Sequence, residues 1–300
     1  MKIGSHVLGN GHPCFIVAEL GANHNGDLDT AIRMIEAAQG AGVDAVKIQC
    51  RTPSLAIPPA QQATIRATPW GDMTYLDYRT KLELSEGALA ELAAAAAQCG
   101  LVLFASAWDV PALERCVRVL QPPCVKIPSA CLTDDVLLRA AAHTILPVFL
   151  STGMSTDAEI RRAVGVLDVA EGSQRILGLG WQRPREQRLM LFYCKSAYPT
   201  ESGQLNLAAI RTLHRQYGGP VGYSGHEGGL WTTLAAVVMG ALAVERHFTL
   251  DKTAFGTDQA ASLEPKEFAQ LVTAIREWER ARGDGTIRVL DSEKPVMEKL

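Results

Sequence analysis

The chain alternates between two kinds of apolar segment along most of its length. One kind is a short, nearly continuous apolar run, which is typical of strands buried on both faces of a parallel sheet. Eight such runs lie at 14–20, 43–50, 101–108, 123–130, 145–152, 189–196, 219–224 and 242–250. The other kind has helical spacing, and its eight segments lie at 28–41, 86–99, 110–120, 134–143, 156–170, 205–217, 229–240 and 265–282.

This alternation predicts βαβ units, and eight of them predict closure into an α/β fold of the (β/α)8 TIM barrel type. A doubly wound open sheet is the structural alternative. Helix start signals agree with the periodicity, since Asp27 and Ser85 stand directly before two of the helical segments. We expect one domain over residues 1–300, with a core at about 12–283 and a short tail at 284–300.

Two connections between these segments are unusually long. Residues 51–84 leave the C-terminal end of the second predicted strand, where long loops often act as lids over a site. Residues 171–188 enter from the opposite face of the predicted barrel and are expected to be a peripheral elaboration.

Composition and charge argue against a nucleic-acid-binding, membrane-spanning or secreted protein. The net charge is −3 with both signs interspersed, so the clustered basic footprint of a nucleic-acid-binding protein is missing. No apolar run reaches the length needed to cross a bilayer, and the first residues do not resemble a signal segment. The seven cysteines form no CxxC pair and are expected to be reduced thiols of a cytoplasmic protein.

Polar and ionisable residues stand at the end of every predicted strand. In a β/α barrel the catalytic side chains come from these C-terminal ends. Burying an unpaired charge costs free energy, so a purely structural barrel would not need charged groups at these positions. The pattern therefore indicates a functional site. The strand-end groups, in chain order, are Glu19, Asn23, His24, Lys47, Gln49, Ser106, Asp109, Lys126, Ser129, Ser151, Thr152, Lys195, Ser196, Tyr198, Ser224, His226, Glu245 and His247.

Three of these residues, Lys47, Lys126 and Lys195, are lysines on separate strands. Lysines that converge in this way can bind a small dianion, for which phosphate is the natural candidate. Neutral donors of the kind that complete an anion cradle are Ser129, Ser151, Thr152 and Ser224.

Two histidines, His226 and His247, end adjacent strands and could ligate one divalent metal. Glu19 and Asp258 are the carboxylates available beside them, and water or substrate oxygens could fill the remaining positions. Either histidine could instead be a hydrogen-bonded core residue or a general base.

The strand-end residues fall within an ordered set of motifs that resembles the sialic acid synthase family, which makes nonulosonic acids. The resemblance covers roughly residues 12–283, and the order of the motifs makes it specific. The motifs are AELGANHNG (18–26), VKIQ (46–49), VKIPSA (125–130), FLSTGMS (149–155), YCKSAYPT (193–200), VGYSGHEGG (221–229), ERHFTLDK (245–252) and GTDQAASLEP (256–265).

The resemblance implies condensation of phosphoenolpyruvate with a hexosamine-type aldose, N-acetylmannosamine or a related sugar. Water is consumed, and the products are a 2-keto-3-deoxy nonulosonic acid and phosphate. It implies a divalent metal at His226 and His247, typically Mn²⁺, with Mg²⁺, Co²⁺ or Zn²⁺ as alternatives. It also implies a homodimer with small-molecule substrates, and the charge and hydropathy patterns above predict no nucleic-acid or membrane partner.

The resemblance further implies roles for individual residues. Glu19 would face the sugar aldehyde, and Glu19, Lys47, Lys126, His226 and His247 would form the catalytic set. The residues expected to hold the phosphate and carboxylate of phosphoenolpyruvate are Lys47, Ser106, Lys126, Ser129, Ser151, Ser196 and Ser224. The residues expected to contact the sugar are Gln49, Tyr198 and Asp258, and Asn23 is expected to bind substrate.

The chain departs from the family pattern at several positions. Lys195 stands where Thr is usual, Pro128 where Gly is usual, and Gly225 where Asp is usual before the metal-binding histidine. Gln259 also departs, whereas Asp258 is kept. Only about 17 residues follow the last predicted helix, so we expect the family's C-terminal antifreeze-like domain to be missing from this chain.

Two alternative functions remain open from the sequence. One is a 3-deoxy-octulosonate phosphate synthase, which uses a phosphorylated pentose and would need a second phosphate site. The other is a catalytically weakened barrel that acts as a binding or assembly subunit, which the departures at Gly225 and Gln259 favour.

Overall fold

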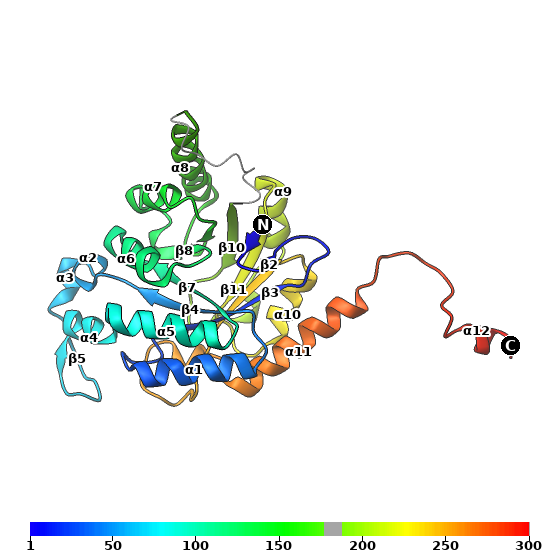
Figure 1. The fold of residues 1–300 in the computed structure, drawn as a ribbon, viewed down its shortest axis with the longest axis horizontal. Helices are drawn as coiled ribbons and strands as arrows, with labels where there is room; N and C mark the ends of the chain where they lie inside the picture. Colours follow the sequence, from blue (N-terminus) through cyan, green and yellow to red (C-terminus); the bar gives the residue numbers. More distant parts are fainter. Residues whose placement is uncertain (177–187, 300) are drawn as a thin grey trace.

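Figure 1 shows the computed structural model, which describes residues 1–176 and 188–299. Eight strands form a closed barrel in the order β3, β4, β7, β8, β9, β10, β11, β12, and every neighbouring pair is parallel. The predicted (β/α)8 TIM barrel is therefore confirmed, and the open-sheet alternative is wrong. Among the described residues, no helix is long and apolar enough to cross a membrane.

The barrel strands coincide with the eight predicted apolar runs. The largest difference is β8, predicted at 123–130 but only three residues long, because Pro128 has no N–H for the sheet and a 3₁₀ turn begins at Ser129. The bounds are β3 Phe15–Gly21, β4 Ala45–Cys50, β7 Val102–Ala107, β8 Val125–Ile127, β9 Val148–Ser151, β10 Leu189–Cys194, β11 Val221–Gly225 and β12 Ala243–His247.

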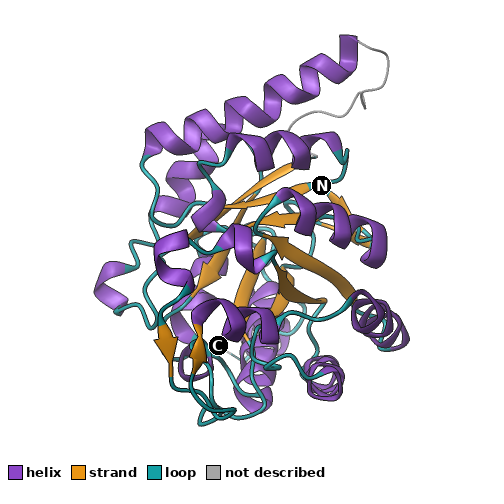
Figure 2. Ribbon diagram, turned by 90° about the vertical axis from the view of Figure 1, so that its left-hand side faces the viewer, coloured by secondary structure: helices purple, strands orange, loops and turns teal. Residues whose placement is uncertain are grey.

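Helices surround the strands, as Figure 2 shows. The caps expected from the sequence are present, since Asp27 and Ser85 each accept a hydrogen bond from the backbone N–H three residues later. The barrel helices are α1 Leu28–Gly40, α5 Glu86–Gln98, α6 Val110–Leu120, α7 Asp135–His143, α8 Asp157–Ile176, α9 Ala209–Tyr217, α10 Trp231–Val238 and α11 Pro265–Ala281. A short helix, α12 Lys294–Met297, lies at the end of an extended segment that projects from the barrel (Figure 1).

The connection predicted at 171–188 begins inside helix α8, which continues six residues beyond the predicted end at 170. The rest of this connection, residues 177–187, lies outside the described residues.

The connection at 51–84 contains regular elements rather than one open loop. Pro53 and Pro59 stand at the first positions of two short helices, and a small antiparallel sheet separates these helices from a longer one. The elements are α2 Pro53–Ala56, α3 Pro59–Gln62, β5 Ile65–Arg66, β6 Met73–Thr74 and α4 Tyr75–Leu82. We call residues 51–84 the β4–α5 insertion.

The inside of the barrel is apolar at the N-terminal ends of the strands. Alternate residues of a strand point to the same side, and these inward positions carry large apolar side chains at the bottom. The rings of Phe104 and Phe149 lie 5.7 Å apart, and those of Phe149 and Phe192 lie 5.1 Å apart. The N-terminal hairpin, β1 Lys2–Ile3 and β2 His6–Val7, adds buried Ile3 and Leu8 to this cluster.

The same alternation places charge at the top of the barrel. In β3, Phe15 and Val17 belong to the apolar cluster, and Glu19 is the next inward residue. In β4, Ala45 belongs to that cluster and Lys47 follows it two positions later. The apolar cluster therefore fills the N-terminal half of the barrel interior and forms the floor of the layer of ionisable strand-end groups.

Candidate active site

A cavity of about 220 Å³ opens at the C-terminal ends of the barrel strands. Twelve of the fourteen predicted site residues line it, and Asn23 and Asp258 do not. Further lining residues are Trp108, Pro128, Ala130, Met154, Cys194 and Glu245. The residues at the ends of separate strands are thus brought to one place.

Lys47, from β4, is buried in a ring of oxygen atoms. Its Nζ donates a hydrogen bond of 2.6 Å to Ser106 Oγ. The same atom lies 3.0 Å from Glu19 Oε2 and 3.3 Å from Glu245 Oε1. An ammonium group has three protons, so these three contacts use its whole donor capacity.

Lys126, from β8, has a similar but less complete set of partners. Its Nζ donates to Ser151 Oγ at 2.6 Å and lies 3.5 Å from Glu245 Oε2. The ammonium group also lies 5.0 Å from the centre of the Phe192 ring in the floor. With two oxygen partners, Lys126 keeps one proton for a ligand in the cavity.

Glu245 connects the two lysines, and the sequence alone did not indicate this role. Its carboxylate contacts both ammonium groups and accepts a hydrogen bond of 3.1 Å from Ser224 Oγ. Its position two residues before His247 in β12 was the available signal, because both then face the barrel interior.

The electrostatics of this cluster follow from burial and pairing. Burial alone would raise the pKa of Glu245, but Lys126 and Lys47 lower it to about 2. Burial would lower the pKa of Lys47, but Glu19 and Glu245 raise it. For Lys126 burial prevails, and its pKa is lowered. Glu245 is therefore held as a carboxylate between two cations at neutral pH.

A second group of donors lies beside Lys126, around Gly153. The backbone N–H of Gly153 donates to Ser129 Oγ at 3.0 Å. A Cβ atom at this position would lie 2.8 Å from Ser129 Oγ and still closer to Ser196 Oγ. Only glycine therefore leaves room for the two hydroxyl groups, which together with Ser151 form a cradle of neutral donors.

His226 and His247 face each other across the other side of the cavity, with ring centroids 5.6 Å apart. The His226 Nδ1–H donates to the Lys195 carbonyl at 2.6 Å, which leaves Nε2 for a ligand. Burial, followed by proximity to His247, lowers the pKa of His226 to about 4, so this imidazole is neutral at pH 7. The ring of Tyr198 lies 4.2 Å from that of His226.

The histidine pair fits a divalent metal ion that takes only two ligands from the protein. His247 Nδ1 is buried with no hydrogen-bond partner, and it lies 3.8 Å from Asp258 Oδ2. Among the described residues, no group of three or more His, Cys, Asp or Glu side chains could hold a metal. Substrate oxygens and water would therefore have to supply the other ligands.

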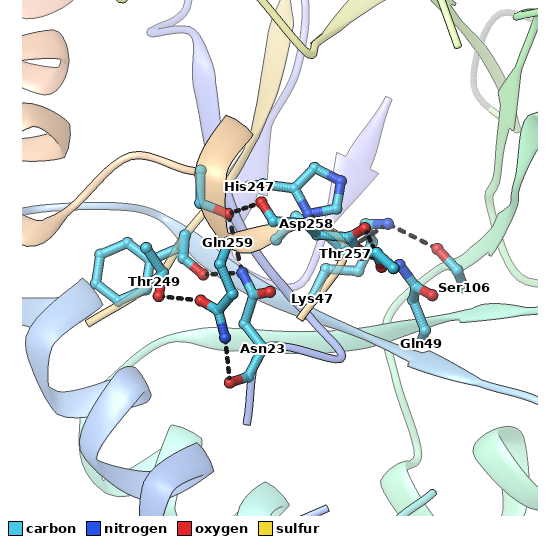
Figure 3. Close-up of polar contacts among 12 residues, drawn as sticks. Asn23, Lys47, Gln49, Ser106, His247, Thr249, Thr257, Asp258 and Gln259 are labelled. Carbon is cyan, nitrogen blue, oxygen red and sulfur yellow. Dashed lines mark hydrogen bonds and ion pairs between the residues drawn. The ribbon is translucent and has the colours of Figure 1, made fainter. Parts of the chain in front are cut away.

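Two of the predicted substrate-binding residues, Gln49 and Asn23, have different surroundings (Figure 3). Gln49 Nε2 donates to Glu19 Oε1 at 3.1 Å, beside Lys47. The side chain of Asn23 donates to the Phe248 carbonyl and Ser262 Oγ, both at 2.9 Å. Asn23 thus ties two loops together, and its predicted role in substrate binding stays a prediction.

Two departures from the family pattern now have structural surroundings. Gln259 is buried, and its Nε2 donates to the Asn23 carbonyl at 3.1 Å, so it belongs to the same tie between loops. Gly225 makes room for a buried ion pair, because a Cβ there would lie 2.7 Å from Glu227 Oε2 and 2.8 Å from Arg246 Cδ.

The expected convergence of three lysines is wrong for Lys195. This residue is exposed, does not line the cavity, and places its Nζ 5.8 Å from the Tyr193 ring centre. The physical reason is the strand alternation, since Cys194 faces the cavity and the next side chain points outward.

Comparisons with known proteins identify the family of this chain. The model of the NeuB family matches residues 34–287. The chain belongs to the NeuB family. It is 35% identical to the human N-acetylneuraminate-9-phosphate synthase over 98% of this chain and 78% of that protein. It is 36% identical to the Campylobacter jejuni N,N'-diacetyllegionaminic acid synthase over 93% of this chain and 80% of that protein.

A solved structure is similar over the whole chain. The sialic acid synthetase of Leptospira borgpetersenii, in complex with citrate, superposes with a TM-score of 0.84 and 31% identity, covering 100% of this chain and 95% of that one. Family membership confirms the expected enzyme class, a phosphoenolpyruvate-dependent synthase that condenses phosphoenolpyruvate with a sugar to give a nonulosonic acid. Enzymes of this family generally depend on a divalent metal.

Proposed function

We propose that the acceptor is a hexosamine-type aldose, N-acetylmannosamine or a related sugar, and that the cavity is divided between the two substrates. The observation that carries this proposal is the contrast within one cavity. One side has cations and hydroxyl donors suited to the phosphate and carboxylate of phosphoenolpyruvate. The other side has two imidazoles beside Glu19 and Gln49, suited to an aldehyde and its hydroxyl groups.

On the first side, the remaining N–H of the Lys126 ammonium group donates a hydrogen bond to the phosphate. The same ammonium group orients Ser151. Ser129 and Ser196, around Gly153, donate to the remaining anionic oxygens. Lys47 is already paired with Glu19 and Glu245, so it acts mainly by holding these carboxylates and Ser106 in place.

On the second side, His226 and His247 would hold the divalent metal, for which we propose Mn²⁺, with Mg²⁺, Co²⁺ or Zn²⁺ as alternatives. When bound, this ion supplies Lewis-acid polarisation of the acceptor carbonyl. Tyr198 packs on the imidazole of His226 and limits the space above it. Asp258 lies near His247 and can accept from a sugar hydroxyl group.

The bond changes balance as follows. C3 of phosphoenolpyruvate attacks the aldehyde carbon, and the aldehyde oxygen takes a proton to become a hydroxyl group. Water adds at C2, and the C2–O bond to phosphate breaks, which leaves a keto group and free phosphate. Glu19 lies where it can orient the acceptor or relay a proton, because its carboxylate is held by Lys47 and Gln49.

Phosphate release from phosphoenolpyruvate tests this function across a panel of acceptors. The panel contains N-acetylmannosamine, mannosamine, their 6-phosphates and a phosphorylated pentose. We expect release with at least one hexosamine and none without an acceptor. Release with the phosphorylated pentose alone would support the octulosonate-type alternative, and no release with any sugar would support the binding-subunit alternative.

We also propose that residues 12–283 form one catalytic domain and that the protein is a cytoplasmic homodimer with no nucleic-acid or membrane partner. All seven cysteines are free thiols, as is typical of proteins in a reducing compartment. Light scattering of the purified protein checks the dimer, and a monomeric mass would contradict it.

A further inference from the structure

A buried arginine lies directly behind the sugar side of the cavity. Arg51 follows the last residue of β4, and only 5% of its surface is exposed. It does not line the cavity. Its guanidinium group lies over the ring of Trp108, 4.3 Å from the ring centre, and Trp108 does line the cavity. Arg51 is therefore a cation held just behind the cavity wall.

The guanidinium group has two specific partners. Its Nε lies 3.2 Å from Glu83 Oε1, and the backbone N–H of Arg51 donates to Glu83 Oε2 at 2.9 Å. One Nη2 proton is donated to Gln49 Oε1. Arg51 and Glu83 stand at the two ends of the β4–α5 insertion, so their pairing anchors the base of this insertion to the cavity wall.

The contact with Gln49 decides which way its amide points. An amide has one acceptor oxygen and one NH₂ donor group. Arg51 donates to the oxygen, and Glu19, whose carboxylate accepts, lies 3.1 Å from the nitrogen. Reversing the amide would set a donor against the guanidinium group and an acceptor against the carboxylate. The two charged neighbours therefore select one orientation, with the NH₂ group toward Glu19 and the cavity.

We infer that Arg51 is a positioning residue for the acceptor sugar: it holds Gln49 as a hydrogen-bond donor facing the cavity. This inference rests on the proposed function, in which Gln49 contacts the sugar. It implies that the acceptor presents an oxygen, from a carbonyl or hydroxyl group, to this part of the wall. Because the side-chain contacts of Arg51 are with Gln49, Glu83 and Trp108, phosphoenolpyruvate binding should not depend on it.

Steady-state kinetics with both substrates test the inference. Arg51→Met should raise the acceptor KM roughly tenfold, the loss expected for one hydrogen bond between Gln49 and the sugar, and leave the phosphoenolpyruvate KM within about twofold. Arg51→Lys keeps the charge beside Glu83 but cannot form both contacts, so it should give the same pattern. It also serves if the methionine variant does not fold.

A double-mutant cycle shows whether Arg51 acts through Gln49. If it does, Arg51→Met should add almost nothing to Gln49→Ala, because interacting residues are not additive. Arg115→Met is the matched control. Arg115 also approaches Glu83, at 4.0 Å, and donates to the Arg51 carbonyl, but has no bond to Gln49. Equal rises in both KM values, or additive effects in the double variant, would overturn the inference.

A crystal structure of the Arg51→Met variant separates this inference from the proposed function. We expect the amide of Gln49 to leave Glu19 or to reverse, whatever reaction the enzyme performs. An unchanged Gln49 would overturn the inference even in an active enzyme. A displaced Gln49 in a protein that releases no phosphate would instead support the positioning role and count against the proposed function.

Discussion

The two sides of the cavity differ in how far their polar groups are already paired. On the phosphoenolpyruvate side, Lys47, Lys126, Ser106 and Ser151 contact one another or Glu245 at strand ends. On the acceptor side, His247 Nδ1 has no hydrogen-bond partner, and Asp258 comes from a loop. In the proposed division of the cavity, the first side is a preorganised anion site built on strands, and the second is open for ligands. This difference determines how each side should respond to substitution.

The largest expected effect is on the phosphoenolpyruvate side. Lys126→Met should lower kcat/KM by about 10²–10³-fold, as removal of a single preorganised donor does elsewhere. Lys195→Met is the matched control, because its side chain is exposed outside the cavity, and it should change kcat/KM less than about twofold. Phosphate release measures both, and equal losses in the two variants would contradict the assignment.

The next effect concerns the metal on the acceptor side. His226→Ala should weaken Mn²⁺ binding at least about tenfold, because the site takes only two ligands from the protein. Electron paramagnetic resonance of added Mn²⁺ measures this without turnover. His214→Ala is the control, since His214 is exposed on α9. Unchanged Mn²⁺ affinity in the His226 variant would reject the metal site.

Substitution of Glu245 tests whether its ion pairs with Lys47 and Lys126 also stabilise the barrel. Glu245→Gln removes the carboxylate shared by two buried ammonium groups, so the free energy of unfolding at pH 7 should fall by about 3 kcal/mol. Urea denaturation followed by circular dichroism gives this value. An unchanged midpoint would show that the lysines do not depend on Glu245 for compensation.

The smallest effect is expected at the donor cradle. Gly153→Ala places a methyl group against Ser129 and Ser196 and should raise the phosphoenolpyruvate KM roughly tenfold through one displaced hydrogen bond. Gly165→Ala makes the same change in α8, where a Cβ meets nothing within 4 Å. That control should leave both KM values unchanged.

The strands and most of the cavity residues could be predicted from the sequence because both follow from alternation. Buried parallel strands give continuous apolar runs, and every second strand-end residue faces the barrel interior. The same rule, applied one residue further, would have excluded Lys195, since Cys194 lines the cavity. Lys195 was grouped with the other two lysines only because it stands near the end of a predicted strand.

The remaining features depend on contacts between distant segments. Glu245 was visible as a strand-end residue, but its role comes from two lysines on other strands. Arg51 follows the end of β4, where strand alternation no longer predicts which way a side chain points. Its orientation is set by contacts with Glu83 and Trp108. The elements inside the β4–α5 insertion are short, so their periodicity was too weak to predict them.

The division of the cavity is tested most directly by calorimetric titration of phosphoenolpyruvate into the unmodified protein and two variants. Lys126→Met should lose measurable binding, because its ammonium group carries the proton left for the phosphate. Asp258→Asn, on the acceptor side, should keep the dissociation constant within about twofold. Retained binding in the Lys126 variant, or equal loss in both, would contradict the division of the cavity into two substrate sides.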